Sequence, residues 1–166
     1  MKKSLSLILG CILVAAMSSA QAYDVSVGRG FESKNQHVTI VDLSKGNLNM
    51  AFERDNISRA ALGYTLDISN FNNILTVKGE VGVADTCGIH MTYAVEPKIS
   101  YTKNKMTGYA SYKYRTALGS TSDKTHTASA GLSYAIMNPV SVGIKVFNET
   151  GDIKNHGVIA NIALAF

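Results

Sequence analysis

The sequence is poor in charged residues and has no long hydrophobic run. Charged residues make up 17% of its 166 residues and hydrophobic residues 46%, whereas soluble domains carry about 25% charged residues. From residue 23 onward, no apolar run approaches the roughly 18 residues that a membrane-spanning helix needs, and no helix-period stripe of useful length occurs. These absences exclude a helical membrane span and predict that something other than water solvates part of the chain.

A cysteine pair and a strong charge excess are also missing. Of the two cysteines, Cys11 lies within residues 1–22, a predicted secretion signal, so Cys87 stands alone and an intramolecular disulfide is excluded. The formal net charge of +4 falls by two when Lys2 and Lys3 are removed with that signal. The remaining excess is too small to indicate a nucleic-acid partner.

Residues 1–22 have the features of a cleaved secretory signal. Lys2 and Lys3 precede an apolar stretch over 5–16, and Ala20-Gln21-Ala22 fits a small-residue cleavage site. The stretch Ile8-Leu9-Gly10-Cys11 resembles a lipoprotein box, but cleavage there would shorten the apolar stretch and leave the Ala-Gln-Ala site unexplained. We therefore expect cleavage near Ala22 and a single mature domain over 23–166.

The mature chain repeats one pattern, the alternation of apolar with small or polar residues. The last eleven residues show it, with Val158, Ile162 and Phe166 on the apolar face and Gly157 and Asn161 on the other. Such period-two runs are typical of strands with one apolar face. The pattern recurs over 58–69, 74–84, 91–102, 106–117, 126–136, 140–149 and 156–166.

A soluble sandwich also alternates, so two further features decide between the architectures. The apolar faces carry Val, Ile, Leu and Tyr with almost no charge over the length that spans a bilayer. Tight connections near 69–73, 102–105 and 137–139 alternate with longer polar ones at 85–90, 118–125 and 149–156. Both features are typical of a transmembrane barrel, whose backbone groups are satisfied only if the sheet closes.

The number of strands depends on the first part of the mature chain. Seven strands follow residue 58, and residues 23–57 hold either one strand or three, over 23–31, 37–43 and 47–53. Three short strands avoid a long structureless loop, which is uncommon. We predict an all-β, antiparallel up-and-down transmembrane barrel with ten strands favoured and eight as the alternative.

The segment Tyr134-Ala135-Ile136-Met137-Asn138-Pro139-Val140-Ser141-Val142, followed by a Gly-Asp loop and a strand ending in Phe, resembles the C-terminal region of the YfaZ family of outer-membrane proteins. Weaker similarity surrounds Leu62-Gly63-Tyr64-Thr65-Leu66. The resemblance implies a porin-like barrel in the outer membrane and brings no catalytic residues or cofactor. A terminal Phe166 also resembles the signature that the barrel-assembly machinery reads, which implies that machinery as a partner.

The charged residues on the polar faces are the candidate lining of the barrel interior. This set has two interpretations: a salt-bridged, closed barrel with its activity in the outer loops, or a narrow, weakly anion-preferring channel for ions or small solutes. No small-molecule ligand is identified by the pattern. The candidates are Glu53, Arg59, Asp67, Lys78, Glu80, Glu96, Lys98, Lys113, Arg115 and Lys145.

All four histidines, His37, His90, His126 and His156, fall at or near the start of strands that run in one direction, so we expect them at the outer rim. A metal-binding collar or an omptin-like hydrolase using His126 and Asp123 would use such a position. However, the ligand spacings of a metal site and a Ser-His motif are both absent. Polar rims commonly contain histidine, so we expect no metal, no cofactor and no enzyme activity.

Overall fold

A computed structural model describes residues 24–33, 37–54, 58–68, 75–85, 89–118, 124–152 and 154–165. The predicted signal over 1–22 lies outside these residues, as do Cys87, Asp123 and Phe166. The cleavage site and the role of the terminal phenylalanine therefore stay predictions.

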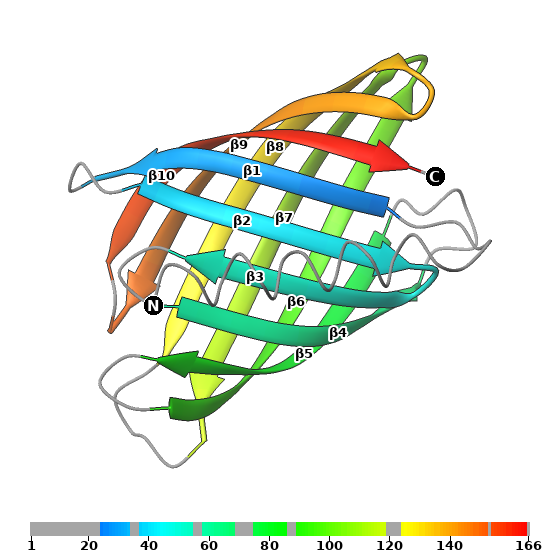
Figure 1. The fold of residues 1–166 in the computed structure, drawn as a ribbon. Coiled ribbons are helices and arrows are strands. Elements are labelled where there is room, and N and C mark those ends of the chain that lie inside the picture. Colours follow the sequence, from blue (N-terminus) through cyan, green and yellow to red (C-terminus); the bar gives the residue numbers. More distant parts are fainter. Residues whose placement is uncertain are drawn as a thin grey trace, which may run out of the picture.

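The described residues form a closed antiparallel barrel of ten strands (Figure 1). Each strand pairs with its neighbours along the chain, and the first strand pairs with the last. The ten-strand prediction is confirmed and the eight-strand alternative is wrong. The strands are β1 (Asp24–Glu32), β2 (His37–Lys45), β3 (Leu48–Arg54), β4 (Ser58–Asp67), β5 (Leu75–Asp85), β6 (Ile89–Lys103), β7 (Met106–Ala117), β8 (Thr125–Met137), β9 (Val140–Gly151) and β10 (Asn155–Ala165).

The two ends of the barrel differ in their connections. At the short-turn end, three connections have two residues each: Gly46 and Asn47, Asn104 and Lys105, and Asn138 and Pro139. The prediction of a tight connection near 69–73 is wrong, because β4 ends at Asp67 and β5 begins only at Leu75. The other end, the loop end, carries the connections after β1, β3, β5, β7 and β9. The alternation in length is weaker than predicted, because β9 continues to Gly151 and β10 begins at Asn155, which shortens the loop expected over 149–156.

Apolar side chains face outward along the strands. In β9, Val142, Ile144 and Val146 are exposed, while Lys145 between them points to the interior. Twenty-seven large hydrophobic side chains of the described residues are exposed, and five hydrophobic residues are buried. Most of the apolar surface therefore lies outside the barrel, the reverse of a water-soluble core.

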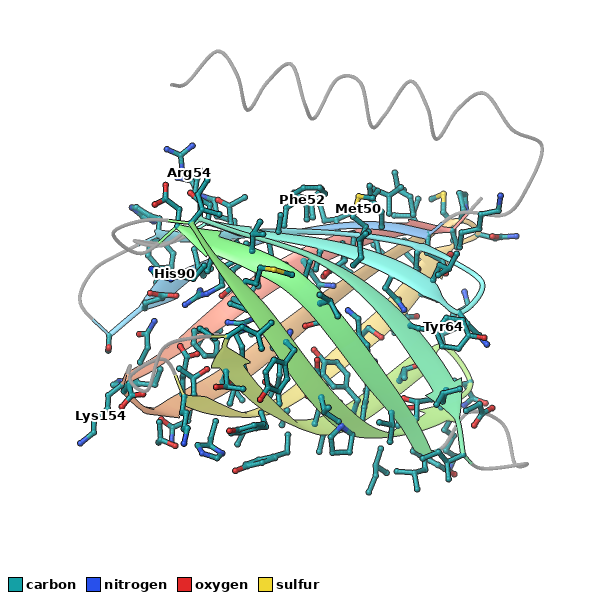
Figure 2. All side chains as sticks on the ribbon, turned by 90° about the horizontal axis from the view of Figure 1, so that it is seen from below. Met50, Phe52, Arg54, Tyr64, His90 and Lys154 are labelled. Carbon is teal, nitrogen blue, oxygen red and sulfur yellow. The ribbon has the colours of Figure 1, made fainter. Side chains whose placement is uncertain are left out.

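Several charged residues of the outward face, such as Arg54 and Lys103, lie at strand ends, whereas Arg29 lies within β1 opposite the middle of β10. Figure 2 shows Arg54 and Lys154 at one end of the barrel and Tyr64 toward the other. Long basic side chains at such positions can reach the headgroup layer while their stems lie on apolar surface. In the part of the chain that the structure describes, no helix is long and apolar enough to cross a membrane.

The barrel closes where β1 meets β10, and glycine makes this contact possible. A Cβ atom at Gly30 would collide with the carbonyl oxygen of Val158 and lie 2.8 Å from the Cα atom of Ile159. The Ile159 side chain lies over β1, and Ile159 and Val38, which pair with Gly30 from either side, are both buried inside the barrel. Close approach of the two backbones therefore depends on the missing side chain.

Candidate functional site: the barrel interior

A cavity of about 490 Å³ occupies the interior and is lined by residues from all ten strands. Its lining reaches from Arg59 and Glu149, near the loop end, to Thr107 and Ser141, near the short-turn end. Every second position of a strand faces the interior, and several of these positions hold small residues such as Ser26 and Ser129. Their small side chains leave this space open.

The structure places nine of the ten predicted interior residues around this cavity. The exception is Asp67, which is exposed because it is the last residue of β4, at the short-turn end of the barrel. The nine residues are Glu53, Arg59, Lys78, Glu80, Glu96, Lys98, Lys113, Arg115 and Lys145.

Two carboxylates that line the cavity, Asp42 and Glu149, are not identified by the sequence pattern. Asp42 shares the inward face of β2 with Val38, Ile40 and Ser44, so half of this face is apolar and it differs little in polarity from the outward face. The pattern places Glu149 at the start of a loop, whereas β9 continues past it to Gly151. The cavity is thus lined by six cationic side chains and five carboxylates.

Near the loop end, Glu53 joins two arginines from different walls. Its Oε1 atom lies 3.3 Å from Nη1 of Arg59, directly opposite on β4, and its Oε2 atom accepts a hydrogen bond of 3.3 Å from Nη2 of Arg115 on β7. Because β3 and β7 are separated by three strands around the barrel, the Glu53–Arg115 contact crosses the interior. It narrows the passage at this level.

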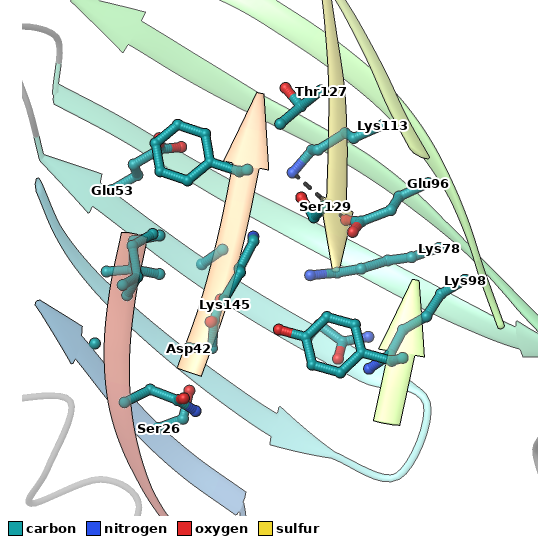
Figure 3. Close-up of a pocket in the computed structure, with 18 of the residues that line it drawn as sticks. Ser26, Asp42, Glu53, Lys78, Glu96, Lys98, Lys113, Thr127, Ser129 and Lys145 are labelled. Carbon is teal, nitrogen blue, oxygen red and sulfur yellow. Dashed lines mark ion pairs between the residues drawn. The ribbon is translucent and has the colours of Figure 1, made fainter. Parts of the chain in front are cut away.

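Halfway along the barrel, Glu80 pairs with two lysines. Oε1 of Glu80 lies 2.8 Å from Nζ of Lys78, and Oε2 contacts Nζ of Lys113. Lys113 also lies 4.0 Å from Oε2 of Glu96, the ion pair drawn in Figure 3. These contacts follow the wall formed by β5, β6 and β7, so they leave space toward the opposite wall.

Lys98 and Lys145 differ from the other interior cations. Nζ of Lys98 lies 4.6 Å from the ring centroid of Tyr109, and neither lysine forms an ion pair with any residue that the structure describes. Figure 3 shows Lys145 on β9 beside the cavity, away from Lys78 and Lys98 on the other wall. Asp42 and Glu149 of the same lining likewise form no ion pair with any described residue, so the excess of one positive charge belongs to the lining as a whole.

Two aromatic rings lie against the wall over glycines. A Cβ atom at Gly131 would be 2.5 Å from Cζ of Tyr109, and one at Gly157 would be 2.9 Å from Cε1 of Phe147. The absence of a side chain at these glycines lets the rings lie flat. Tyr109 and Phe147 therefore occupy less of the cavity than they would if their rings pointed toward its centre.

The four predicted rim histidines all lie at the loop end, at or next to the first residue of β2, β6, β8 or β10. They do not converge: the ring of His37 contacts that of Phe31, and Nδ1 of His126 is 2.7 Å from the Tyr112 hydroxyl. Within the described ranges, no group of three His, Cys, Asp or Glu side chains could hold a metal ion.

Solved structures share this architecture. The KdgM porin in complex with disordered oligogalacturonate matches 86% of this chain and 99% of its own with a TM-score of 0.51 and 7% identity. A de novo designed transmembrane β-barrel matches 90% of this chain and 98% of its own with a TM-score of 0.50 and 14% identity. At these identities the likeness concerns the fold, which is that of small transmembrane barrels.

No model of a known protein family matches the chain, and no curated protein sequence matches it. The resemblance to the YfaZ family therefore stays a prediction.

Proposed function

We propose that this protein is a narrow, weakly anion-preferring channel for ions or small solutes in the bacterial outer membrane. The observation that carries the proposal is the polar cavity, which every strand lines and which extends toward both ends of a barrel with an apolar exterior. A closed barrel with such an exterior satisfies its backbone groups within a bilayer. The barrel-assembly machinery is the proposed partner during insertion.

The proposed preference for anions rests on the one positive charge by which six cations exceed five carboxylates, and Lys98 and Lys145 are the two cations without an ion pair among the described residues. The other interior cations lie beside carboxylates, so their fields are largely compensated close to the wall. Rings of uncompensated lysine or arginine favour anions in pores. With six cations and five carboxylates around the cavity, the preference is weak.

The test is single-channel recording of the purified protein in a planar bilayer, with the reversal potential measured in a salt gradient. We expect discrete conductance steps and a slight preference for anions. In the Lys98→Gln/Lys145→Gln double variant, carboxylates outnumber the cations that remain, so the reversal potential should change sign. Lys154→Gln, in the connection between β9 and β10, is the control and should behave like the wild type.

A folded barrel without conductance would contradict the channel. An unchanged reversal potential in the double variant would contradict the role of the two lysines while leaving the channel in place. Gel heat-modifiability must first show that each variant is folded.

The second candidate is a closed barrel whose activity lies in its outer loops. The specific observation in its favour is the contact between Glu53 and Arg115, which crosses the interior near the loop end. The two candidates differ in whether the wild type conducts. The hydrolase alternative depends on Asp123, which lies outside the described residues.

A further inference from the structure

A second cavity, of about 600 Å³, lies on the outer surface at the short-turn end. Ile99 and Tyr101 of β6 form one wall, Leu132 of β8 forms the other, and Gly108 and Ala110 of β7 form the floor. Its volume is within the range of about 300–1,000 Å³ that is usual for small-molecule sites. The cavity is a groove along β7 that opens toward the surroundings of the barrel.

The register of the three strands explains the groove. Gly108 stands directly between Tyr101 and Leu132, and Ala110 lies opposite Ile99. Both walls carry large, exposed side chains. On the β6 wall Tyr101 is 66% exposed and Ile99 59%, and on the β8 wall Leu132 is 51% exposed. Because Gly108 has no side chain and Ala110 has only a methyl group, the outer surface is lower along β7 than along the two walls.

A basic end closes the groove. Lys103, the last residue of β6, lines it, and Lys105 follows in the turn. The sequence has no acidic residue between Glu96, which lines the interior, and Asp123, and none between Asp123 and Glu149. The strands around the groove therefore offer no carboxylate at this end, and Lys103 forms no ion pair with any described residue.

We propose that this groove binds one glycerophospholipid with an anionic headgroup. One acyl chain lies along β7 over Gly108 and Ala110, between Tyr101 and Leu132, and the phosphate lies at Lys103. The headgroup supplies the negative charge that the neighbouring strands lack, and the chain fills the apolar gap. The proposal rests on the proposed membrane location, but it is independent of whether the interior conducts.

Two glycines on the outer face provide a matched pair of variants. A Cβ atom at Gly108 would meet only Cδ2 of Leu132, at 3.4 Å, so the backbone has room for a Cβ atom and the side chain of Gly108→Leu should occupy the groove. Gly79 lies on the outer face of β5 opposite Tyr64 and Val95, and a Cβ atom there meets nothing within 4 Å. Gly79→Leu adds the same side chain away from the groove.

The experiment is native mass spectrometry of the protein released from micelles that contain equal amounts of phosphatidylglycerol and phosphatidylcholine. We expect the wild type and Gly79→Leu to retain one phosphatidylglycerol and Gly108→Leu to lose it. Since a lysine near an anionic headgroup contributes about 1 kcal/mol, Lys103→Gln should weaken the preference for phosphatidylglycerol about fivefold. Lys154→Gln, at the loop end, should leave it unchanged.

Equal retention by the wild type and Gly108→Leu would overturn the proposal, and so would equal loss in the two leucine variants. Equal retention of the two lipids by the wild type would overturn the role of Lys103. Dimers that disappear in Gly108→Leu would instead identify the groove as a contact between two copies of the chain. A barrel that retains phosphatidylglycerol but shows no conductance would remove the proposed channel and leave this site in place.

Discussion

At the scale of single residues, the carboxylate of Glu53 holds together Arg59 and Arg115 from two walls of the barrel. In Glu53→Gln, the neutral amide attracts the guanidinium groups far less than a carboxylate does, so Arg115 can withdraw toward β7. We expect higher single-channel conductance and stronger anion preference, because the obstacle and one negative charge are both removed. If the wild type is silent, conductance that appears only in this variant would show that this contact closes the interior.

Glu149→Gln is the matched control for this prediction. It removes one carboxylate from the same cavity near the same end, but Glu149 forms no ion pair with any described residue and accepts a hydrogen bond of 3.5 Å from Thr127. The control should shift selectivity without raising conductance. Equal conductance in the two variants would contradict the role of the Glu53–Arg115 contact.

The pairing of Tyr109 with Gly131 gives a second prediction at this scale. In Gly131→Ala, the new methyl group would overlap the far end of the tyrosine ring, so the ring must leave the wall and enter the cavity. Single-channel conductance should fall, and the double variant with Tyr109→Ala should recover it. Gly79→Ala, on the outer face, is the control, and failure of the double variant to recover would contradict the explanation.

The sequence could assign interior side chains by alternation but could not give their partners. Strand parity alone is enough to place Glu53, Arg59 and Arg115 on the inner face. The contact between Glu53 and Arg115, however, joins residues 62 positions apart and depends on barrel diameter and strand tilt. Alternation is also a poor guide where the inner face mixes apolar and polar residues, as around Asp42 in β2.

At the scale of elements, closure of the barrel depends on how near β1 can approach β10. A methyl group at Gly30 would meet the backbone of β10, which cannot move without breaking the strand ladder, whereas one at Gly28 would meet mainly Cγ2 of Ile159, at 2.8 Å. We therefore expect Gly30→Ala to lower the free energy of unfolding by about 1–3 kcal/mol or more. Gly28→Ala should lower the free energy of unfolding by clearly less, because the Ile159 side chain can shift away from the new methyl group.

The measurement is urea unfolding in lipid vesicles, with the folded fraction read from gel heat-modifiability. Gly79→Ala, with open space around it, corrects for the general effect of replacing glycine in a strand. Equal losses in Gly28→Ala and Gly30→Ala would show that backbone contact at the seam does not limit closure.

The elements themselves were largely predictable from the sequence. Period-two alternation located the seven strands after residue 58, and the rarity of long structureless loops favoured the three strands before it. Strand ends were less accurate: β9 runs beyond Glu149, since polar residues at a rim can continue a ladder as well as leave it. The closing contact of β1 with β10 could be expected only from the need to satisfy edge strands.

At the scale of the whole molecule, the exposed apolar belt distinguishes a barrel in lipid from one in water. Ile144 lies near the middle of β9 and is 50% exposed, and Ile89 is the first residue of β6 and 80% exposed. If water surrounded the barrel, replacing either residue by arginine would change the free energy of unfolding by no more than about 0.5 kcal/mol. In a bilayer, the cost of arginine depends on depth, because only side chains near an interface can reach the headgroups.

We therefore expect Ile144→Arg to lower the free energy of unfolding in vesicles by about 2–4 kcal/mol and Ile89→Arg by about 0–1 kcal/mol. Urea titrations monitored by heat-modifiability would measure both values. The two variants carry the same substitution at different depths, so each is the control for the other. Similar small costs at the two positions would contradict a membrane-spanning belt. A large cost confined to Ile144 would establish that lipid, and not water, surrounds the middle of the barrel.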